Sequence, residues 1–209
     1  MVSLRSLVTG VALASSVLGA ATPQQIADGI KSITRRVQNL QTPAQSITAL
    51  YDPSIDISKG PFPQVVTGLT NVASTTNALA SQISGSEPIQ KRGVSSRIAR
   101  RGPDADDIFV AFQEYVSAGQ DLLNVLIDKA GIATQVPGLS QFVVASLVVY
   151  EASVITLSVT VTDLTQARAS DLTSEAELLR ETLDTAIKTY EGLLSELGAP
   201  TCLLLRNAL

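Results

Sequence analysis

Apolar residues that return every three or four positions are the feature that most limits how this chain can fold. Such spacing places the apolar side chains on one face of an α-helix. The stripes run from Ile26 to Leu50, from Val65 to Ile83, from Ile108 to Ile127 and from Leu172 to Leu197. Each stripe needs another apolar surface to cover it, so these segments are predicted to pack together as a bundle.

A fifth segment, residues 139–161, is apolar at most positions instead of along one stripe. Between Phe142 and Val161 the only charge is Glu151. The alternation from Leu157 to Val161 favours a strand locally, and a membrane span also competes. Its length and its helical neighbours favour a buried helix. We therefore predict an all-α fold, an antiparallel bundle of about five helices with one central apolar helix.

The helix boundaries carry recognisable signals. Thr22-Pro23-Gln24-Gln25 has the residues of a capping box with proline in the first turn, which predicts a helix start. The similar Thr42-Pro43-Ala44-Gln45 predicts a kink or a restart. Residues 51–63 contain three prolines and a glycine, so we expect a loop there.

The first twenty residues have the layout of a secretory signal peptide. Arg5 precedes an apolar run from Leu7 to Val17, and small residues follow at Gly19 and Ala20. The run is too short to span a bilayer, so we expect export and no transmembrane segment. Cys202 is the only cysteine. Because no disulfide can form within the chain, stability must come from packing.

Composition argues against several classes of function. The chain contains no histidine and no tryptophan, so the commonest general base and the commonest zinc ligand are missing. The net charge of −4 disfavours a nucleic-acid partner. The acidic pairs Asp106 with Asp107 and Glu175 with Glu177 lie at predicted helix starts, where capping and the helix dipole explain them. We predict a protein that is not an enzyme, with no cofactor and no metal site.

Two groups of residues resemble a known family. Phe112-Gln113-Glu114-Tyr115-Val116 leads into the segment from Leu122 to Gly131, and a matching segment, Thr185 to Tyr190, follows in the last helix. This arrangement resembles the fungal hydrophobic surface-binding protein A and cell-wall galactomannoprotein family. The resemblance covers most of the chain and is strongest from Ile108 to Tyr190.

The resemblance implies a secreted or cell-wall protein that binds hydrophobic surfaces or lipids such as fatty acids. Two alternatives are a structural cell-wall mannoprotein and a surface adaptor that recruits a secreted esterase. A carboxylate would repel an ionised fatty acid, so tyrosine hydroxyls are better candidates for its polar end. The candidate lipid-binding residues are Phe112, Tyr115, Val116, Leu123, Leu147, Tyr150, Ile155, Leu179, Leu183 and Tyr190.

Residues 85–103 depart from the helical pattern. Apolar periodicity stops there, and basic residues stand among glycines and serines, so we expect a flexible linker between the helices of residues 21–84 and those of residues 104–209. The dibasic pairs Lys91-Arg92 and Arg100-Arg101 are candidate processing sites, because exported fungal chains meet a protease that cuts after such pairs. A basic linker also contains such pairs by chance.

Overall fold

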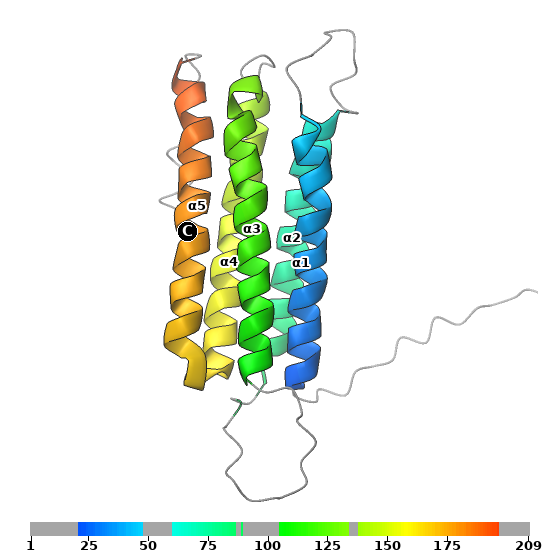
Figure 1. Cartoon of the computed structure of the whole chain (residues 1–209), viewed down its shortest axis with the longest axis vertical. Coiled ribbons are helices and arrows are strands. Elements are labelled where there is room, and N and C mark those ends of the chain that lie inside the picture. Colours follow the sequence, from blue (N-terminus) through cyan, green and yellow to red (C-terminus); the bar gives the residue numbers. More distant parts are fainter. Residues whose placement is uncertain (1–20, 48–59, 87–88, 90–104, 134–137, 197–209) are drawn as a thin grey trace, which may run out of the picture.

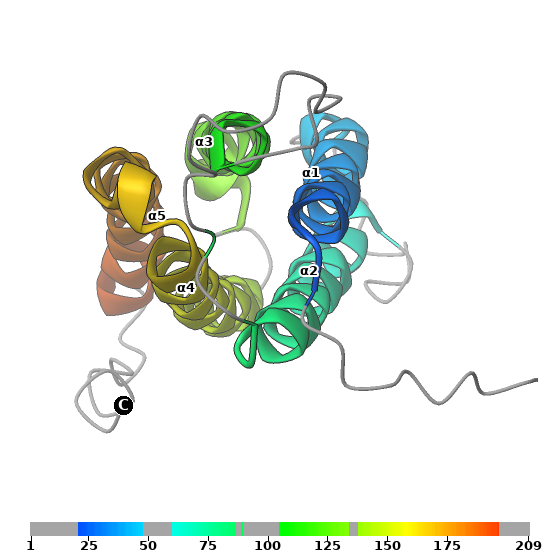
Figure 2. The ribbon, with the colours of Figure 1, turned by 90° about the horizontal axis from the view of Figure 1, so that it is seen from below.

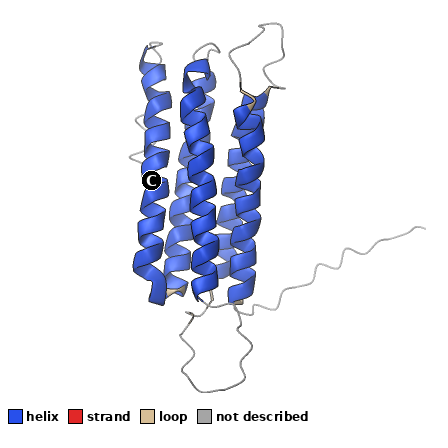
Figure 3. Cartoon of the chain, in the orientation of Figure 1, coloured by secondary structure: helices blue, strands red, loops and turns tan. Residues whose placement is uncertain are grey.

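The computed structural model describes residues 21–47, 60–86, 89, 105–133 and 138–196. All regular structure in these ranges is helical (Figure 1, Figure 3), which confirms the predicted all-α fold with five helices. The helices are α1 (Pro23–Gln45), α2 (Pro61–Ile83), α3 (Ala105–Ala133), α4 (Leu139–Leu164) and α5 (Ala169–Glu196), with a short 3-10 helix, η2 (Gln166–Arg168), before α5.

The five helices are arranged as a ring. Seen along the helices (Figure 2), the order around the ring is α1, α2, α4, α5 and α3. Each helix packs closely against its two neighbours in this order, whereas α3 and α4 touch only slightly although they follow each other in sequence. No helix of the described chain therefore occupies the centre, and side chains from all five helices fill it.

Helix direction alternates along the sequence, as the predicted antiparallel bundle requires. The pair α1 and α2 is antiparallel, with Gly29 beside Leu79 near one end and Gly68 beside Leu40 near the other. The ring also brings α3 and α5 together in parallel, as the hydrogen bond from Gln113 to Glu175 (2.8 Å) illustrates. The antiparallel order thus holds between successive helices, and ring neighbours include parallel pairs.

The start of α1 agrees with its sequence signal, whereas the structure at Pro43 and at the start of α2 differs from the predictions. Gln25 donates a backbone hydrogen bond to the Thr22 hydroxyl (3.3 Å), and Thr22 donates one to the Gln25 side chain (2.9 Å), which completes the capping box. At Pro43 the helix neither restarts nor breaks, and it ends two residues later at Gln45. Pro61 opens α2 instead of belonging to the predicted loop, because proline at the first helical position loses no hydrogen bond.

Helix α4 forms part of the ring wall, which corrects the expectation of a central helix buried on all sides. Leu147, Tyr150 and Val154 are buried against the interior, whereas Phe142 is 66% exposed on the outer side. By length and composition α4 is apolar enough to cross a membrane, yet here it packs between α2 and α5. Hydropathy counts apolar residues without indicating their direction, so it overestimated the burial of this helix.

Candidate functional site

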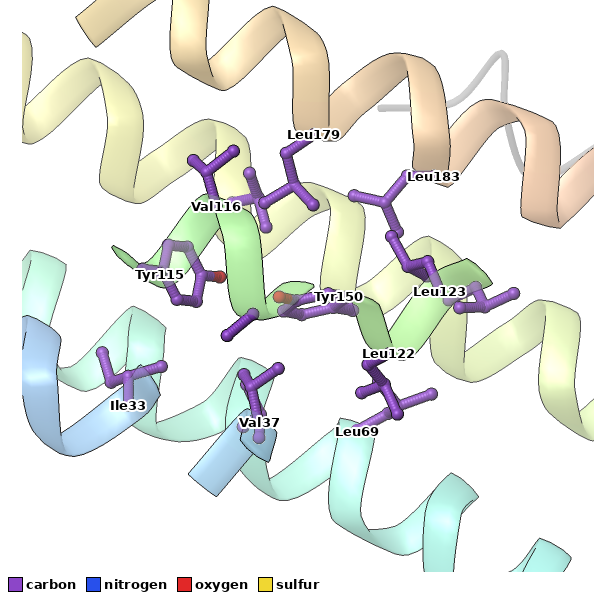
Figure 4. Packing of buried hydrophobic residues seen from close by; sticks show 14 of the residues in the cluster. Ile33, Val37, Leu69, Tyr115, Val116, Leu122, Leu123, Tyr150, Leu179 and Leu183 are labelled. Atoms are coloured by element: carbon purple, nitrogen blue, oxygen red, sulfur yellow. The ribbon is translucent and has the colours of Figure 1, made fainter. Parts of the chain in front are cut away.

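The candidate site is the interior of the ring, where most of the predicted lipid-binding residues meet. Helices α3, α4 and α5 each contribute such residues, and α1 and α2 complete the lining with residues such as Ile33 and Leu69 (Figure 4). The predicted candidates that are fully or almost fully buried are Phe112, Tyr115, Val116, Leu123, Leu147, Tyr150, Leu179, Leu183 and Tyr190. Among described residues, the interior is thus mainly aliphatic and aromatic.

Ile155 is the predicted candidate that the structure places elsewhere. Its side chain is 38% exposed on the outer side of α4. Ile155 follows Tyr150 by five residues, which is about 140° around an α-helix, so the two side chains point in different directions. Val154, at about 40° from Tyr150, lies in the core instead and was not among the predicted candidates.

Two tyrosine hydroxyls inside the ring have no hydrogen-bond partner in the described structure. Tyr115 of α3 and Tyr150 of α4 are completely buried, and neither hydroxyl makes a hydrogen bond. Figure 4 shows the two hydroxyls pointing toward one another between the helices. An unsatisfied buried polar group costs about 1–3 kcal/mol. The pair is therefore a polar spot within an apolar interior.

Other buried hydroxyls show how unusual this pair is. Thr34, Thr76, Ser146, Ser153 and Thr165 each donate a hydrogen bond to a backbone carbonyl three or four residues earlier, at 2.7–3.0 Å. Such local bonds are the usual way for a helix to satisfy serine and threonine. Among the described side chains, the unsatisfied buried hydroxyls are those of Tyr115, Tyr150 and Ser140, which lies in the first turn of α4.

Burial makes both tyrosines harder to deprotonate. Loss of water around the Tyr115 side chain, followed by the proximity of Tyr150, raises the pKa of Tyr115 well above its ordinary value. Burial also raises the pKa of Tyr150 to about 12. At neutral pH both side chains are therefore phenols that can donate a hydrogen bond and also accept one.

Tyr190 of α5 is a third buried tyrosine, but its hydroxyl is satisfied. It donates a hydrogen bond of 2.8 Å to the backbone carbonyl of Leu126 on α3. Burial raises its pKa as well. This contact joins two neighbouring helices, so we interpret Tyr190 as a structural residue and not as part of the polar spot.

Gly119 of α3 makes room for the polar spot. A Cβ atom at this position would lie 3.2 Å from the Tyr150 hydroxyl and 2.9 Å from Cδ1 of Leu179. The sequence analysis did not identify this residue. An isolated glycine inside a helical pattern is the signal that could have found it, since glycine destabilises a helix interior and usually has a packing reason.

Charged side chains of the described chain gather away from this interior. Arg168 bonds Asp106 at 2.7 Å and Asp171 at 2.8 Å, and its guanidinium lies over the ring of Phe109. This contact fastens η2 to the beginnings of α3 and α5. Among the described residues, no group of three or more His, Cys, Asp or Glu side chains could hold a metal ion.

Several predictions fall on residues outside the described ranges. They concern the signal peptide of residues 1–20, the candidate processing residues Lys91, Arg92, Arg100 and Arg101, and the thiol of Cys202. These remain predictions.

Comparison with solved structures identifies proteins with the same fold. Ligand binding domain 2 of the Penicillium marneffei MP1 protein, described in complex with multiple arachidonic acids, has a TM-score of 0.63 and 15% sequence identity. The alignment covers 79% of this chain and 93% of that domain. Ligand binding domain 1 of the same protein, in complex with arachidonic acids, has a TM-score of 0.59 and 15% identity, with coverage of 79% and 98%. At this identity the similarity establishes the fold.

No family model matches the chain, and no curated protein matches it. The family resemblance proposed from the residues of α3 and α5 therefore remains a prediction.

Proposed function

We propose that this protein binds long-chain fatty acids in the interior of the helical ring and is not an enzyme. The observation that carries this proposal is the ring itself, whose apolar interior contains no helix and holds two unsatisfied hydroxyls. The MP1 domains that share the fold are described in complex with arachidonic acids. Their ligand belongs to the class that an apolar interior with a small polar spot would accept.

Ring geometry supports this proposal, because an acyl chain at the ring axis would have to displace side chains and no helix. If helix axes lie about 9 Å apart and are evenly spaced around a ring of five, each axis is about 8 Å from the centre. A helix with its side chains has a radius of about 5–6 Å. Only long side chains reach the ring axis, and an acyl chain lying along that axis would contact side chains and no backbone.

Burial of methylene groups would supply most of the binding free energy. Each buried methylene contributes about 0.8 kcal/mol, so a chain with about fourteen of them gains about 11 kcal/mol before the cost of association. The same figure predicts that affinity rises about fourfold for each added methylene until the ring is filled.

Titration of the protein with saturated fatty acids that differ in chain length tests this proposal. We expect saturable binding at a defined stoichiometry and the stepwise rise in affinity with length. A soluble helical bundle of similar size serves as the control for nonspecific partition. Binding no stronger than that of the control bundle, or affinity independent of chain length, would rule out an internal lipid site.

A second candidate function is adsorption to hydrophobic surfaces through the outer side of α4. Phe142, Val149 and Val159 are 66%, 48% and 55% exposed on this helix. Replacing these three residues with serine should reduce retention on hydrophobic polymer particles and leave fatty-acid binding unchanged. Equal retention of the variant and the original protein would exclude this surface.

We further propose that the protein acts outside the cell, in the medium or the cell wall, as the residues of its first segment predict. As a surface adaptor, the protein would recruit a secreted esterase. The alternative is that it is a structural mannoprotein of the cell wall. Co-sedimentation of an esterase with polymer particles, measured with and without this protein, separates the adaptor from the structural role.

A further inference from the structure

We propose that the hydroxyls of Tyr115 and Tyr150 together bind the carboxyl group of the fatty acid, an inference that rests on the proposed function and names its polar contact. The two phenols come from α3 and α4, which are not neighbours in the ring and touch only slightly (Figure 2). A group that bridges the two hydroxyls would therefore lie inside the ring and not at its surface.

The first argument is that neither hydroxyl has a partner at hydrogen-bond geometry among the described residues, and the polar groups that affect the pKa of Tyr115 and Tyr150 are each other and, for Tyr115, Thr76. The described threonine and serine hydroxyls buried in mid-helix bond to backbone carbonyls, and Tyr190 bonds to the Leu126 carbonyl. Phenylalanine would fill the same space at positions 115 and 150 without leaving a buried polar group unsatisfied. A ligand that accepts hydrogen bonds there would complete the missing interactions.

The second argument is chemical fit. Two hydroxyls that point toward one another can each meet one oxygen of a carboxyl group. A phenol both donates and accepts, so the pair can bind an ionised carboxylate through two donated bonds or the protonated acid through one donated and one accepted bond. The protonated acid offers the pair both a donor and an acceptor, whereas an ester offers acceptors alone, so the pair should favour the acid.

The third argument is the space around the pair. Gly119 has no side chain where the Tyr150 hydroxyl approaches α3. Thr76 of α2 is also buried, and its own hydroxyl proton is committed to the Val72 carbonyl at 2.8 Å. The polar spot is therefore flanked by the Gly119 backbone, against which Leu179 also packs, and by the small side chain of Thr76.

The experiment compares Tyr115→Phe and Tyr150→Phe with the matched control Tyr190→Phe. Each variant is titrated with a fatty acid, its methyl ester and the alkane of equal length, and the melting temperature of the unliganded protein is recorded. We expect Tyr115→Phe and Tyr150→Phe each to weaken fatty-acid binding about tenfold, which corresponds to about 1.4 kcal/mol, and to leave alkane binding unchanged. Tyr190→Phe should keep the preference of the original protein for the acid over the alkane, because the Tyr190 hydroxyl is already bonded to the Leu126 carbonyl.

The melting temperature provides an independent readout. Tyr115→Phe and Tyr150→Phe should melt at the same temperature as the original protein or higher, because they remove unsatisfied hydroxyls. Tyr190→Phe should melt at a lower temperature, because it removes the bond to Leu126.

Three results would overturn the proposal. The first is unchanged fatty-acid affinity in both phenylalanine variants while the original protein binds normally, which would leave the proposed function intact. The second is an equal loss for fatty acid and alkane, which would assign the tyrosines to shaping the interior. The third is binding of no fatty acid by the original protein, in which case the proposed function fails as well.

Discussion

The substitution Gly119→Ala tests how closely α3, α4 and α5 pack around the candidate site. Alanine at a helix interior position normally stabilises a protein by about 0.5–1 kcal/mol relative to glycine. Here the new Cβ would lie 2.9 Å from Leu179 and 3.2 Å from the Tyr150 hydroxyl. Crowding of a packed interior costs about 1–3 kcal/mol, so we expect a net destabilisation of about 0.5–2 kcal/mol.

Gly192→Ala is the matched control for this prediction. Gly192 lies in α5, and a Cβ built there would meet nothing within 4 Å. The same chemical change should therefore stabilise the protein by about 0.5–1 kcal/mol, because only the helix preference remains. The two variants should change stability in opposite directions.

Urea denaturation followed by circular dichroism measures both variants, and linear extrapolation converts the curves into free energies of unfolding. Fatty-acid titration of Gly119→Ala adds a functional readout. Displacement of the Tyr150 hydroxyl should weaken binding of the acid more than binding of the alkane. If both alanine variants stabilise the protein equally, the close approach at Gly119 is not present in solution and the reasoning fails.

Three further predictions concern pH, the capping box and the linker. Unfolded tyrosines lose their protons near pH 10, whereas the buried ones stay protonated, so the unfolded state binds fewer protons there. The free energy of unfolding should therefore fall from about pH 10 upward, by about 1.4 kcal/mol per pH unit for each buried tyrosine; a flat profile in alkaline urea titrations would contradict this. Thr22→Ala removes the capping bond of α1 and should cost about 1 kcal/mol in the same assay, and no loss would contradict the cap. Cleavage after both dibasic pairs should release a short peptide that begins at Gly93 and should leave two long chains by denaturing mass spectrometry. The two long chains should remain one particle by gel filtration, because α1 packs on α3 and α2 on α4; an uncut chain would exclude processing.

Much of the fold could be predicted from the sequence because helix periodicity is a local property. The stripe from Ile26 to Val37 is buried as expected, and charged residues between its members, such as Asp28, Arg35 and Arg36, are exposed. The capping box at Thr22 is likewise a contact within four residues. Sequence signals that involve residues so close along the chain act in the same way wherever the helix lies in the fold.

The arrangement of the helices could not be predicted in this way. Nothing in the stripes indicates that α2 packs on α4 or that α3 lies between α1 and α5, since those contacts join residues far apart in the sequence. The polar pair of Tyr115 and Tyr150 depends on the same arrangement. Both tyrosines were candidates from the sequence, but their proximity, their missing partners and the role of Gly119 follow only from the ring.

The outer side of α4 shows most clearly the difference between apolar residues that the fold requires and apolar residues that it does not. The ring needs apolar residues only where α4 faces the interior and its neighbours α2 and α5. Phe142, Val149 and Val159 point elsewhere and remain largely exposed, so they bury little surface and polar replacements should change stability by no more than about 0.5 kcal/mol. Folding therefore does not account for their apolar character, whereas contact with a hydrophobic surface would. In the proposed function, the inner side of α4 would contact a lipid and its outer side a hydrophobic surface.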